Sequence, residues 1–448
     1  MRRPKKLLVS VTGIMLCAAG VATSGVAAAG VEHSSAASSI KANISIWGWP
    51  GSMTPFQDSM GNFHKLYPGI SVTYDVASWS TTQTKLATAI ASGSGAPDIS
   101  WVDGSQIQHF VQVGGLTNVT SAVGSLKSDF PSFKLDLAEN SSGQLFAWPG
   151  DMGPVMLWYN SKIFAKYNLP VPTTWTQYIQ DGTVLKSHGI YMLDLAKSYL
   201  TNEYQPNTSI FQFLLQEAGG SLYNAQGKST IDSPQGREAM TIFEDMYKAG
   251  IGANINRWTP AEWDAYKSGT VATIVDAAWM LNDFPVYITT AAEGLGDWRV
   301  APMPRINASQ PGGATDGGSY LVVPAQITGT QRQASMDFIK FMDTNTQALL
   351  QWAKFGLIPS YLPVYKNPAL LKTPHPEFGT ENVIPVIEQA STYVKGGVYL
   401  EPAAYRQATN YIDGTIGPVA SGSNKESISA YLSATAAQLT AFQLAYSS

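Results

Sequence analysis

Residues 63–76 read FHKLYPGISVTYDV, and this stretch decides the fold class. It begins inside a predicted helix over residues 54–67, which the pair Pro68-Gly69 ends. Four apolar side chains recur in that helix at helical spacing: Phe56, Met60, Phe63 and Tyr67. After the glycine, apolar and polar side chains alternate over residues 70–76, as they do in a strand with one buried face. The stretch therefore predicts a helix that returns directly into a strand.

The same alternation of strand and helix continues on both sides of this stretch. Upstream, Ile44 and Ile46 alternate with polar residues and predict a first strand. Downstream, residues 82–92 return to helix, and residues 99–102 form a third short strand after the turn Ala96-Pro97-Asp98. Strand–helix–strand–helix–strand is typical of an α/β layer with a parallel sheet. The sequence therefore predicts the α/β class.

The rest of the chain is predicted to be more helical. Ser233 is a good N-cap, Pro234 suits the first helical position, and Gly250 ends that helix. Further elements are predicted as helices over 259–266, 331–342 and 425–445 and as a strand over 271–275. No internal repeat is present.

Length and composition narrow the class of protein. The chain has 448 residues, which favours two or more domains. Hydrophobic residues make up 44% and charged residues only 13%, so there is enough apolar surface for folding and disorder is excluded as the general state. The net charge is −4, and removal of the four N-terminal cations leaves about −8. This acidic balance argues against nucleic acid or anionic lipid as a partner.

The N-terminus reads as an export signal over residues 1–29, followed by a Ser/Ala-rich tether over 30–42. Four cations precede the apolar run 7–21, and Ala27-Ala28-Ala29 offers a cleavage site. An uncleaved membrane anchor is the alternative, although the run is short for one. Cys17 is the only cysteine; lipid anchoring through it stays open, although Leu16 before it fits a lipidation signal poorly. We expect an exported protein at the cell surface, extracellular or periplasmic.

An ordered series of short patterns resembles the family of extracellular solute-binding proteins that includes the maltose and multiple-sugar receptors. Each pattern is weak alone, and together they span nearly all of the chain after the tether. They are FHKLYPGISV from Phe63, GAPDISWVD from Gly95, Trp148-Pro149, LWYN from Leu157, PTTW from Pro172, GTVATIVDAAW ending at Trp279, Gly317-Gly318 and GLIPS from Gly356.

The resemblance implies a two-lobed, type II periplasmic-binding-protein-like fold with the ligand in the cleft between the lobes. Both lobes are then discontinuous, with residues 43–151 plus 298–345 in lobe 1 and residues 152–297 plus 346–448 in lobe 2. It implies capture of a mono- or oligosaccharide, closure at a hinge, and delivery to the transmembrane permease subunits of an ABC-type importer. We expect a monomer that needs no cofactor and binds no nucleic acid.

Candidate ligand-binding residues follow from strand ends and from the resemblance. Ligands of parallel sheets bind at the carboxyl ends of strands, which indicates Trp49, Trp101 and Asp103. A helix N-cap is the alternative role of Asp103. The resemblance points most directly to Trp279, which follows the segment that carries a sugar-stacking Trp in the family. The remaining candidates are Asp151, Gln205, Asn207, Asp276, Asn282, Gly317, Gly318, Tyr361, Tyr405 and Arg406.

Carbohydrate is the expected solute because flat aromatic rings suit the apolar faces of sugars. The chain has 12 Trp and 21 Tyr residues. Two alternatives stay open: a receptor for a non-sugar solute such as a polyol or glycerol phosphate, and an extracellular carbohydrate-active enzyme with a pair of carboxylates. The five histidines are scattered singly and show no metal-binding spacing. The sequence therefore predicts a receptor with neither a metal nor a catalytic residue.

Overall fold

The computed structural model describes residues 39–196, 206–289, 295–307, 309, 312–396 and 403–447. By its internal contacts the chain divides into Met1–Ala36 and Ala37–Ser448, and all described residues lie in the second unit. The predicted signal, most of the tether and Cys17 lie outside the described residues. Within the described part, no helix has the length and apolar character required to cross a membrane.

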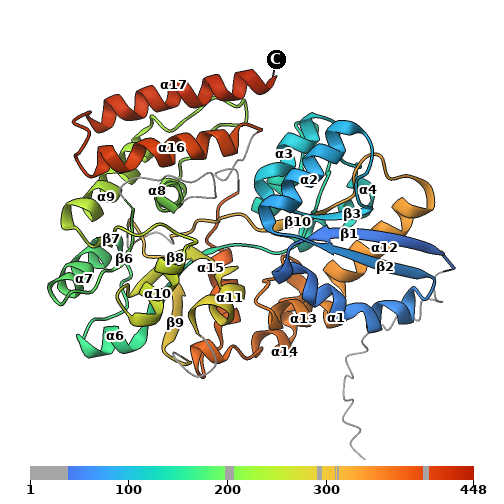
Figure 1. Cartoon of the computed structure of the whole chain (residues 1–448), viewed down its shortest axis with the longest axis horizontal. Helices are drawn as coiled ribbons and strands as arrows, with labels where there is room; N and C mark the ends of the chain where they lie inside the picture. The colour runs from blue at the N-terminus through green and yellow to red at the C-terminus, as the bar shows by residue number, and fades with distance from the viewer. Residues whose placement is uncertain are drawn as a thin grey trace, which may run out of the picture. The chain divides into compact units, whose positions relative to one another are not determined.

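A five-stranded sheet forms the first half of the fold, in the order β2-β1-β3-β10-β4 (Figure 1). The strands are β1 (Ala42–Gly48), β2 (Ile70–Val76), β3 (Ile99–Asp103), β4 (Trp148–Pro149) and β10 (Ser319–Val322). β1 pairs in parallel with β2 and β3, whereas β10 runs antiparallel to β3 and β4. The predicted series of three strands and two helices is confirmed, and β10 joins it from much later in the chain.

Helices cover both faces of this sheet. Figure 1 shows α1 (Pro50–Leu66) and α12 (Gly329–Thr344) on one face and α2 (Trp79–Ser92) and α3 (Gly104–Gln112) on the other. α2 begins at Ser78, whose Oγ accepts a hydrogen bond from the Thr81 N–H at 3.2 Å, and ends at Gly93 with φ 70°. Shorter helical segments are α4 (Thr120–Val123), η1 (Gly124–Asp129), α5 (Ser132–Ala138), η3 (Leu362–Lys366), α14 (Pro368–Leu371) and η4 (Pro376–Phe378).

A second, antiparallel sheet has the order β8-β5-β9. Its strands are β5 (Val155–Asn160), β8 (Thr273–Ala277) and β9 (Trp298–Pro302). The two faces of β5 belong to different apolar cores, because Met156 and Trp158 pack in the core that contains Trp101, whereas Val155 and Leu157 pack in the other. Two short strands between β5 and β8 in sequence, β6 (Leu193–Asp194) and β7 (Gly252–Ala253), pair in parallel.

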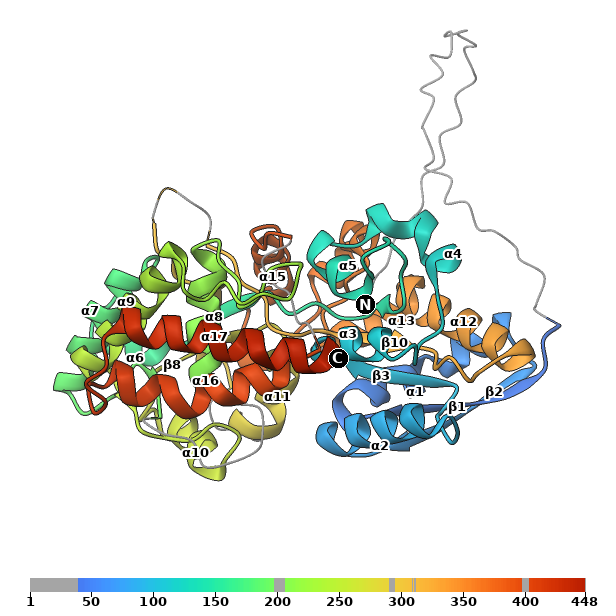
Figure 2. The ribbon, with the colours of Figure 1, turned by 90° about the horizontal axis from the view of Figure 1, so that it is seen from above.

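Helices make up most of the second half. They are α6 (Ser161–Lys166), α7 (Trp175–Ser187), α8 (Pro206–Glu217), α9 (Pro234–Ala249), α10 (Pro260–Ser268), α11 (Met280–Asp283), η2 (Phe284–Ile288), α15 (Val383–Ser391), α16 (Tyr405–Ala420) and α17 (Ile428–Ser447). The predicted caps of α9 are confirmed, since Ser233 Oγ accepts from the Gly236 N–H and Gly250 adopts φ 61°. α16 and α17 lie side by side in both views (Figures 1 and 2).

Two boundaries differ from the predicted lobes. β9 was grouped with lobe 1 from residue 298 on, yet it pairs with β5 in the three-stranded sheet. Helix α13 (Thr346–Lys354) was grouped with lobe 2, yet it packs against α1, with the Trp352 ring 5.2 Å from the Phe56 ring. Neither strand pairing nor the partner of an apolar helix face has a local sequence signal, and the boundaries shifted for that reason.

Residues 150–154 and 312–318 carry the chain between the two sheets, and residues 355–361, between α13 and η3, lie beside the first of them. We call these three the crossing segments. Backbone hydrogen bonds join them, from Met152 N–H to the Ile358 oxygen at 2.8 Å and from Asp316 N–H to the Gly153 oxygen at 2.9 Å. Such short, adjacent connections are where a hinge between two lobes would bend.

Candidate functional site

Trp279 lies just after β8 and pairs with a second tryptophan that the sequence analysis did not single out. Its ring centroid is 5.6 Å from that of Trp258, with 30° between the planes, and both side chains are partly exposed. The Trp279 Nε1–H donates to the backbone oxygen of Asp316, on a crossing segment, at 3.3 Å. We call these two rings the tryptophan pair. They form an aromatic surface next to the place where the chain passes between the sheets.

Trp258 has an unusual backbone conformation, with φ 58°. A left-handed conformation costs a bulky L-residue about 1–2 kcal/mol. The Trp258 N–H donates a short hydrogen bond to the carboxylate of Glu262. Thr259 caps α10 in the same turn, because its Oγ1 accepts from the Glu262 N–H at 3.4 Å. Thr259 thus caps α10, and the Glu262 side chain reaches back one residue beyond the cap to hold the Trp258 peptide.

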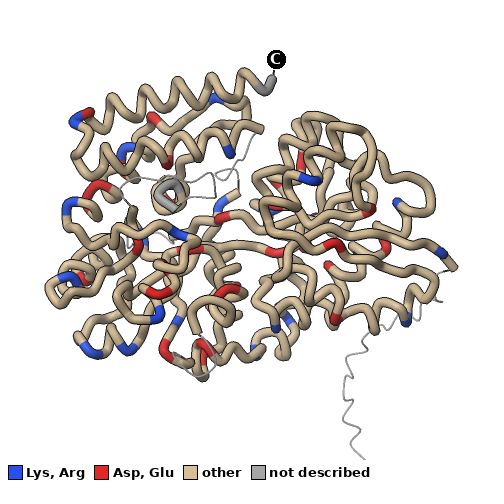
Figure 3. Tube along the Cα trace, in the orientation of Figure 1, with Lys and Arg blue, Asp and Glu red and all other residues tan. Residues whose placement is uncertain are grey.

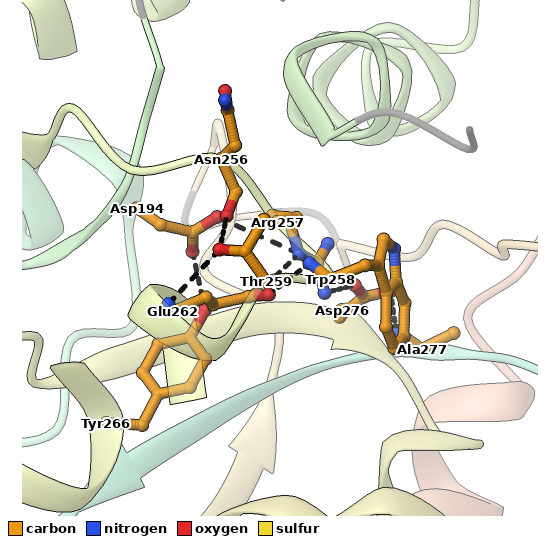
Figure 4. A network of polar contacts seen from close by, with 9 residues as sticks. All are labelled: Asp194, Asn256, Arg257, Trp258, Thr259, Glu262, Tyr266, Asp276 and Ala277. Atoms are coloured by element: carbon orange, nitrogen blue, oxygen red, sulfur yellow. Dashed lines mark hydrogen bonds and ion pairs between the residues drawn. The ribbon is translucent and has the colours of Figure 1, made fainter. Parts of the chain in front are cut away.

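Arg257 lies at the centre of a buried group of charges beneath Trp258 (Figure 4). Its side chain is 5% exposed, and its Nε donates to Glu262 Oε1 at 3.1 Å. It also forms a close ion pair with Asp276 and lies 3.7 Å from an oxygen of Asp194. The Tyr266 hydroxyl donates to Asp194 at 2.7 Å and to Glu262 at 3.1 Å. We call these five residues the Arg257 cluster.

Carboxylates outnumber the cation in this cluster, and burial raises the pKa of two of them, Glu262 and Asp276. Burial raises the pKa of Glu262 to about 7, although Arg257 acts in the opposite direction. Burial likewise raises the pKa of Asp283 to about 7, and the nearby carboxylate of Asp276 adds to the effect. The pKa of Asp276 is itself raised by burial. Glu262 and Asp283 therefore take up protons near neutral pH, because burial penalises their charged forms.

Asp276 was predicted to contact ligand, but the structure gives it a different role. It is 1% exposed, its Oδ1 accepts from the Ala277 N–H at 2.6 Å, and its other contacts go to Arg257. It therefore fixes the end of β8, two residues before the Trp279 peptide, and offers no surface to a solute. Its position three residues before a predicted stacking Trp explains why it attracted the prediction.

A second buried cation, Lys134, belongs to α5, and its Nζ lies next to Gly318. Its side chain is fully buried, its Nζ donates to the Ser319 oxygen at 3.3 Å, and it lies 3.7 Å from the centre of the Tyr320 ring. The carboxylates of Asp151 and Asp343 are buried around it, and burial raises the pKa of both, while Lys134 acts in the opposite direction. We call these residues, with Ser319 and Tyr320, the Lys134 cluster.

Asp151 anchors backbone within this cluster. It is 3% exposed, and its Oδ1 accepts from the Ser319 N–H at 2.6 Å. Gly317 and Gly318 have φ of 60° and 78°, which glycine adopts freely. A Cβ on Gly318 would lie 2.7 Å from the backbone oxygen of Asp151 and 2.8 Å from Lys134 Nζ. Backbone geometry and packing thus account for both glycines, and their predicted approach to a ligand stays a prediction.

The predicted residues of the first sheet have separate environments. Trp101 is 1% exposed and packs at 5.5 Å against both Phe56 and Trp352, so it belongs to the core and has no face left for a solute. Trp49 is partly exposed at the start of α1, 6.3 Å from Trp101. Asp103 caps α3, accepting from the Ser105 N–H at 2.9 Å, which is the alternative role that the sequence left open.

The other candidates divide between packing and exposed positions. Asn282 donates to the Phe355 oxygen at 2.5 Å and ties α11 to a crossing segment. Tyr405 is 2% exposed, with its hydroxyl bonded to Gln212 at 2.5 Å, and thus lies in a core, against the prediction. Tyr361 is partly exposed, 5.7 Å from Phe130, and the Arg406 guanidinium lies 4.7 Å from the Trp79 ring centre. Gln205 lies outside the described residues, as does the side chain of Asn207.

A surface groove of about 550 Å³ runs along α2 and ends at Trp47. It is lined mainly by hydroxyl-bearing side chains and by Lys85, whose Nζ lies 4.2 Å from the centre of the Trp47 ring. None of the predicted ligand-binding residues line it. Among the described residues, no group of three or more metal-ligating side chains is placed to hold a metal ion. The tryptophan pair is the candidate ligand-binding surface because of its two partly exposed rings and its contact with a crossing segment.

Sequence reasoning missed Trp258, Arg257 and Glu262. One signal was available, because Thr259-Pro260-Ala261-Glu262 has the spacing of a capping box with proline in the first turn. That pattern predicts a helix start and hence a fixed residue before it. The positive φ of Trp258 and the burial of Arg257 have no signature in the sequence.

Comparisons with known proteins agree with this architecture. The family profile described as bacterial extracellular solute-binding protein matches residues 48–348. The arabinooligosaccharide-binding protein of Halalkalibacterium halodurans is 23% identical over 344 residues, which cover 74% of each chain. The diacetylchitobiose binding protein DasA of Streptomyces coelicolor is 23% identical over 361 residues, which cover 77% of this chain and 80% of that one.

A solved structure shares the fold across nearly the whole described chain. It is the ABC transporter associated binding protein from B. animalis subsp. lactis Bl-04 in complex with β-1,6-galactobiose. The TM-score is 0.73 at 21% identity, and the match covers 90% of this chain and 98% of that one. The α/β, type II periplasmic-binding-protein-like fold is therefore established, and the chain belongs to the bacterial extracellular solute-binding protein family.

Proposed function

We propose that this protein is an extracellular receptor that captures an oligosaccharide and delivers it to an ABC-type importer. The observation that carries the proposal is the tryptophan pair, whose two partly exposed rings lie 5.6 Å apart beside a crossing segment. Pyranose and furanose rings present apolar C–H faces that pack on indole rings, and two adjacent rings can serve neighbouring sugar units. An oligosaccharide fits this surface better than a small polyol does.

The charges of the described chain favour a neutral solute. Lys and Arg are scattered among Asp and Glu along the trace (Figure 3). Arg257, the cation next to the tryptophan pair, is buried and paired with carboxylates. A phosphorylated or acidic solute would need an unpaired cation at the site. The known relatives named above carry names that refer to arabinooligosaccharide and diacetylchitobiose, which supports the same chemical class here.

Capture requires the two halves to close around the solute. We propose that the three crossing segments act as the hinge and that lobe 1 comprises the five-stranded sheet with α1 to α5, α12 and α13. Lobe 2 comprises the three-stranded sheet with α6 to α11 and α15 to α17. A sugar stabilises the closed form by the contacts that it makes to both lobes there. The cation–π contact between Trp79 on α2 and Arg406 on α16 joins helices of the two proposed lobes.

Membership of the family implies export and association with an importer. The receptor is a monomer held at the cell surface or in the periplasm, and it hands its sugar to the transmembrane permease subunits. Cys17 is the candidate point of a lipid anchor. The protein binds no nucleic acid, performs no catalysis and needs no cofactor.

A thermal-shift screen tests the proposal directly. The purified chain without residues 1–29 is melted with a panel that holds arabinotriose, N,N′-diacetylchitobiose, β-1,6-galactobiose, maltotriose, glycerol 3-phosphate and sorbitol. We expect one of the oligosaccharides to raise Tm, since ligand at 100 times Kd adds about 2.7 kcal/mol. A shift with glycerol 3-phosphate or sorbitol alone would contradict the sugar assignment. Chromatography of the same mixtures after incubation must return the intact sugar, and shorter products would contradict the receptor.

A further inference from the structure

We infer that Trp258 is a sugar-stacking residue and that Glu262, joined to Arg257, is the positioning residue that holds its ring beside Trp279. This inference rests on the proposed function and deepens it, because it assigns the second stacking surface and the structure that fixes it.

The backbone of Trp258 is the first step. Among the described residues, two that are not glycine have positive φ, Asn168 and Trp258. Asn adopts this conformation readily, whereas a large aromatic residue rarely does. Strained backbone of this kind persists where the surroundings enforce it, and it concentrates at binding sites. The conformation of Trp258 therefore calls for an explanation that the fold alone does not provide.

Glu262 is the group that enforces it. The residue is fully buried in the first turn of α10, and its carboxylate accepts hydrogen bonds from three donors. These are the Trp258 N–H, the Arg257 Nε–H and the Tyr266 hydroxyl. Hydrogen bonds that involve ionised groups are among the stronger ones in proteins. The carboxylate thus fixes the peptide from which the Trp258 ring projects, and it cannot rotate away without losing all three donors.

Arg257 joins the two halves of the tryptophan pair. Arg257 directly precedes Trp258 in the loop, and its guanidinium binds Glu262 in the first turn of α10 and Asp276 on β8. Asp276 also accepts from the Ala277 N–H, and Trp279 follows two residues later. Figure 4 shows these side chains converging from the loop, α10 and the end of β8. A single planar cation therefore ties together the two segments that place the two rings.

Buried charge alone does not mark a binding site, since the Lys134 cluster is also buried; the strain at Trp258 sets the Arg257 cluster apart. Burying one cation among three carboxylates is costly, and apolar residues of similar volume often stabilise a core as well or better. The cluster also enforces strain at Trp258, which adds to that cost. Local features that oppose stability are expected where function requires them. The cluster and the strain are explained if the protein uses their result, which is the fixed spacing of the Trp258 and Trp279 rings.

The test compares four variants with the wild type: Trp258→Gly, Glu262→Ala, Glu262→Gln and the double variant Trp258→Gly with Glu262→Ala. Affinity is measured by calorimetric titration with the panel sugar that gives the largest Tm shift. The geometry of the pair is measured without sugar by the exciton-coupled circular dichroism of the indoles. Glycine relieves the strain but loses the ring's packing on Trp263 and Trp279, so Trp258→Gly lowers the Tm of the sugar-free protein and lowers affinity by about tenfold or more.

The positioning role makes a distinctive prediction. Glu262→Ala lowers affinity by about fivefold or more and changes the indole couplet, and Glu262→Gln, which keeps an acceptor, restores part of both. In the Trp258→Gly background, Glu262→Ala lowers affinity no further, because there is no ring left to position. An equal additional loss in that background would overturn the proposal, as would wild-type affinity in Trp258→Gly. If Glu262→Ala fails to fold, Trp258→Gly and Glu262→Gln still decide it.

The chain offers matched controls. Asp98 is another buried carboxylate, which lies just before β3 and accepts from the Ser45 N–H at 2.8 Å. Asp98→Asn must leave affinity and the couplet unchanged, and so must Asn168→Gly. A loss in either control equal to that in the test variants would overturn the specific role of Glu262. If no panel sugar binds, the proposed function fails, and the indole couplet of Glu262→Ala still decides the positioning role.

Discussion

Two buried cations anchor two neighbouring parts of the molecule, and they do so in different ways. Arg257 binds side chains: carboxylates from β6, α10 and β8 converge on its guanidinium. Lys134 contacts backbone and an aromatic ring in addition to the nearby Asp151 and Asp343: its ammonium donates to the Ser319 oxygen and lies over the Tyr320 ring. A planar group with five donors suits several carboxylates at once, whereas a compact ammonium suits a carbonyl and an aromatic face.

The two clusters serve different parts of the candidate site. The Arg257 cluster places rings that can contact a solute, and the Lys134 cluster places a turn of backbone where the chain crosses between sheets. We therefore expect changes at Arg257 to alter affinity and stability together. Changes at Lys134 should act mainly on stability and on closure.

The largest effect is expected when either cation is removed. Arg257→Leu and Lys134→Met each leave buried carboxylates without their partner, which costs about 3–5 kcal/mol of unfolding free energy. Both losses are measured by urea denaturation at pH 7 and should shrink at pH 5, where the carboxyls take up protons. Sugar affinity should fall further in Arg257→Leu than in Lys134→Met. The reverse order would break the proposed division between the clusters.

A smaller effect is expected at Gly318. Gly318→Ala places a Cβ 2.7 Å from the Asp151 oxygen and 2.8 Å from Lys134 Nζ, and φ is 78°. We expect a loss of about 2–3 kcal/mol, from left-handed strain plus displacement of the Lys134 cluster. Gly93→Ala is the matched control, because its φ is 70° and no heavy atom lies within 4 Å of the added Cβ. Its loss of about 1–2 kcal/mol isolates the strain, and equal losses in thermal melts of the two variants would refute the packing contribution.

The pH dependence of stability is expected to be moderate and to have a definite sign. The pKa of Glu217, Glu262 and Asp283 is raised by burial to about 7, and that of Asp181 to about 6. These groups hold more protons in the folded than in the unfolded state between about pH 4.5 and 7. The free energy of unfolding therefore falls as pH rises through that range, by about 1.4 kcal/mol per pH unit for each excess proton.

One group opposes this trend. Burial lowers the pKa of His375 to about 4, so the unfolded state binds one more proton than the folded state below about pH 6.5. The four carboxyl groups outweigh the one imidazole, so the free energy of unfolding still falls as pH rises. Tm should drop by roughly 3 °C or more between pH 5 and 7.5. Glu262→Gln should make the curve shallower, whereas a Tm that rises with pH would contradict the burial of these carboxyls.

The smallest effect is expected at Asp103. As the N-cap of α3, it should tolerate Asn, and Asp103→Ala should cost about 1 kcal/mol in unfolding free energy. Calorimetric titration of both variants decides whether it has a second role. If Asp103→Asn keeps stability but lowers sugar affinity, the carboxylate contacts the ligand as the sequence proposed. If affinity is unchanged, the cap is its whole contribution.

Much of the fold could be predicted because its signals are local. The alternation after Gly69 marks β2, and Ser233, Pro234 and Gly250 mark the ends of α9. The origin of β10 and the packing of α13 were missed because strand partners and helix neighbours depend on contacts distant in sequence. The two-lobed fold was predicted from the order of the family patterns, because local periodicity does not show how many lobes a chain forms.

The candidate site was predicted less completely, for physical reasons. Trp279 was found through its place after a strand and through the family pattern. Trp101, also at a strand end, is buried because α1 and α13 cover it, which strand position alone does not reveal. Asp276 was identified as a polar residue near the site, but a buried partner, Arg257, occupies its carboxylate. Burial of charge depends on the whole fold and has no local pattern.

The central claim is that the tryptophan pair is the sugar-stacking surface. The most direct measurement is the Tm shift that the best panel sugar gives in Trp279→Ala, with Trp47→Ala as the control for loss of a partly exposed Trp elsewhere. We predict that Trp279→Ala loses most of the shift while Trp47→Ala keeps it. A full shift in Trp279→Ala would contradict the claim and place the sugar elsewhere.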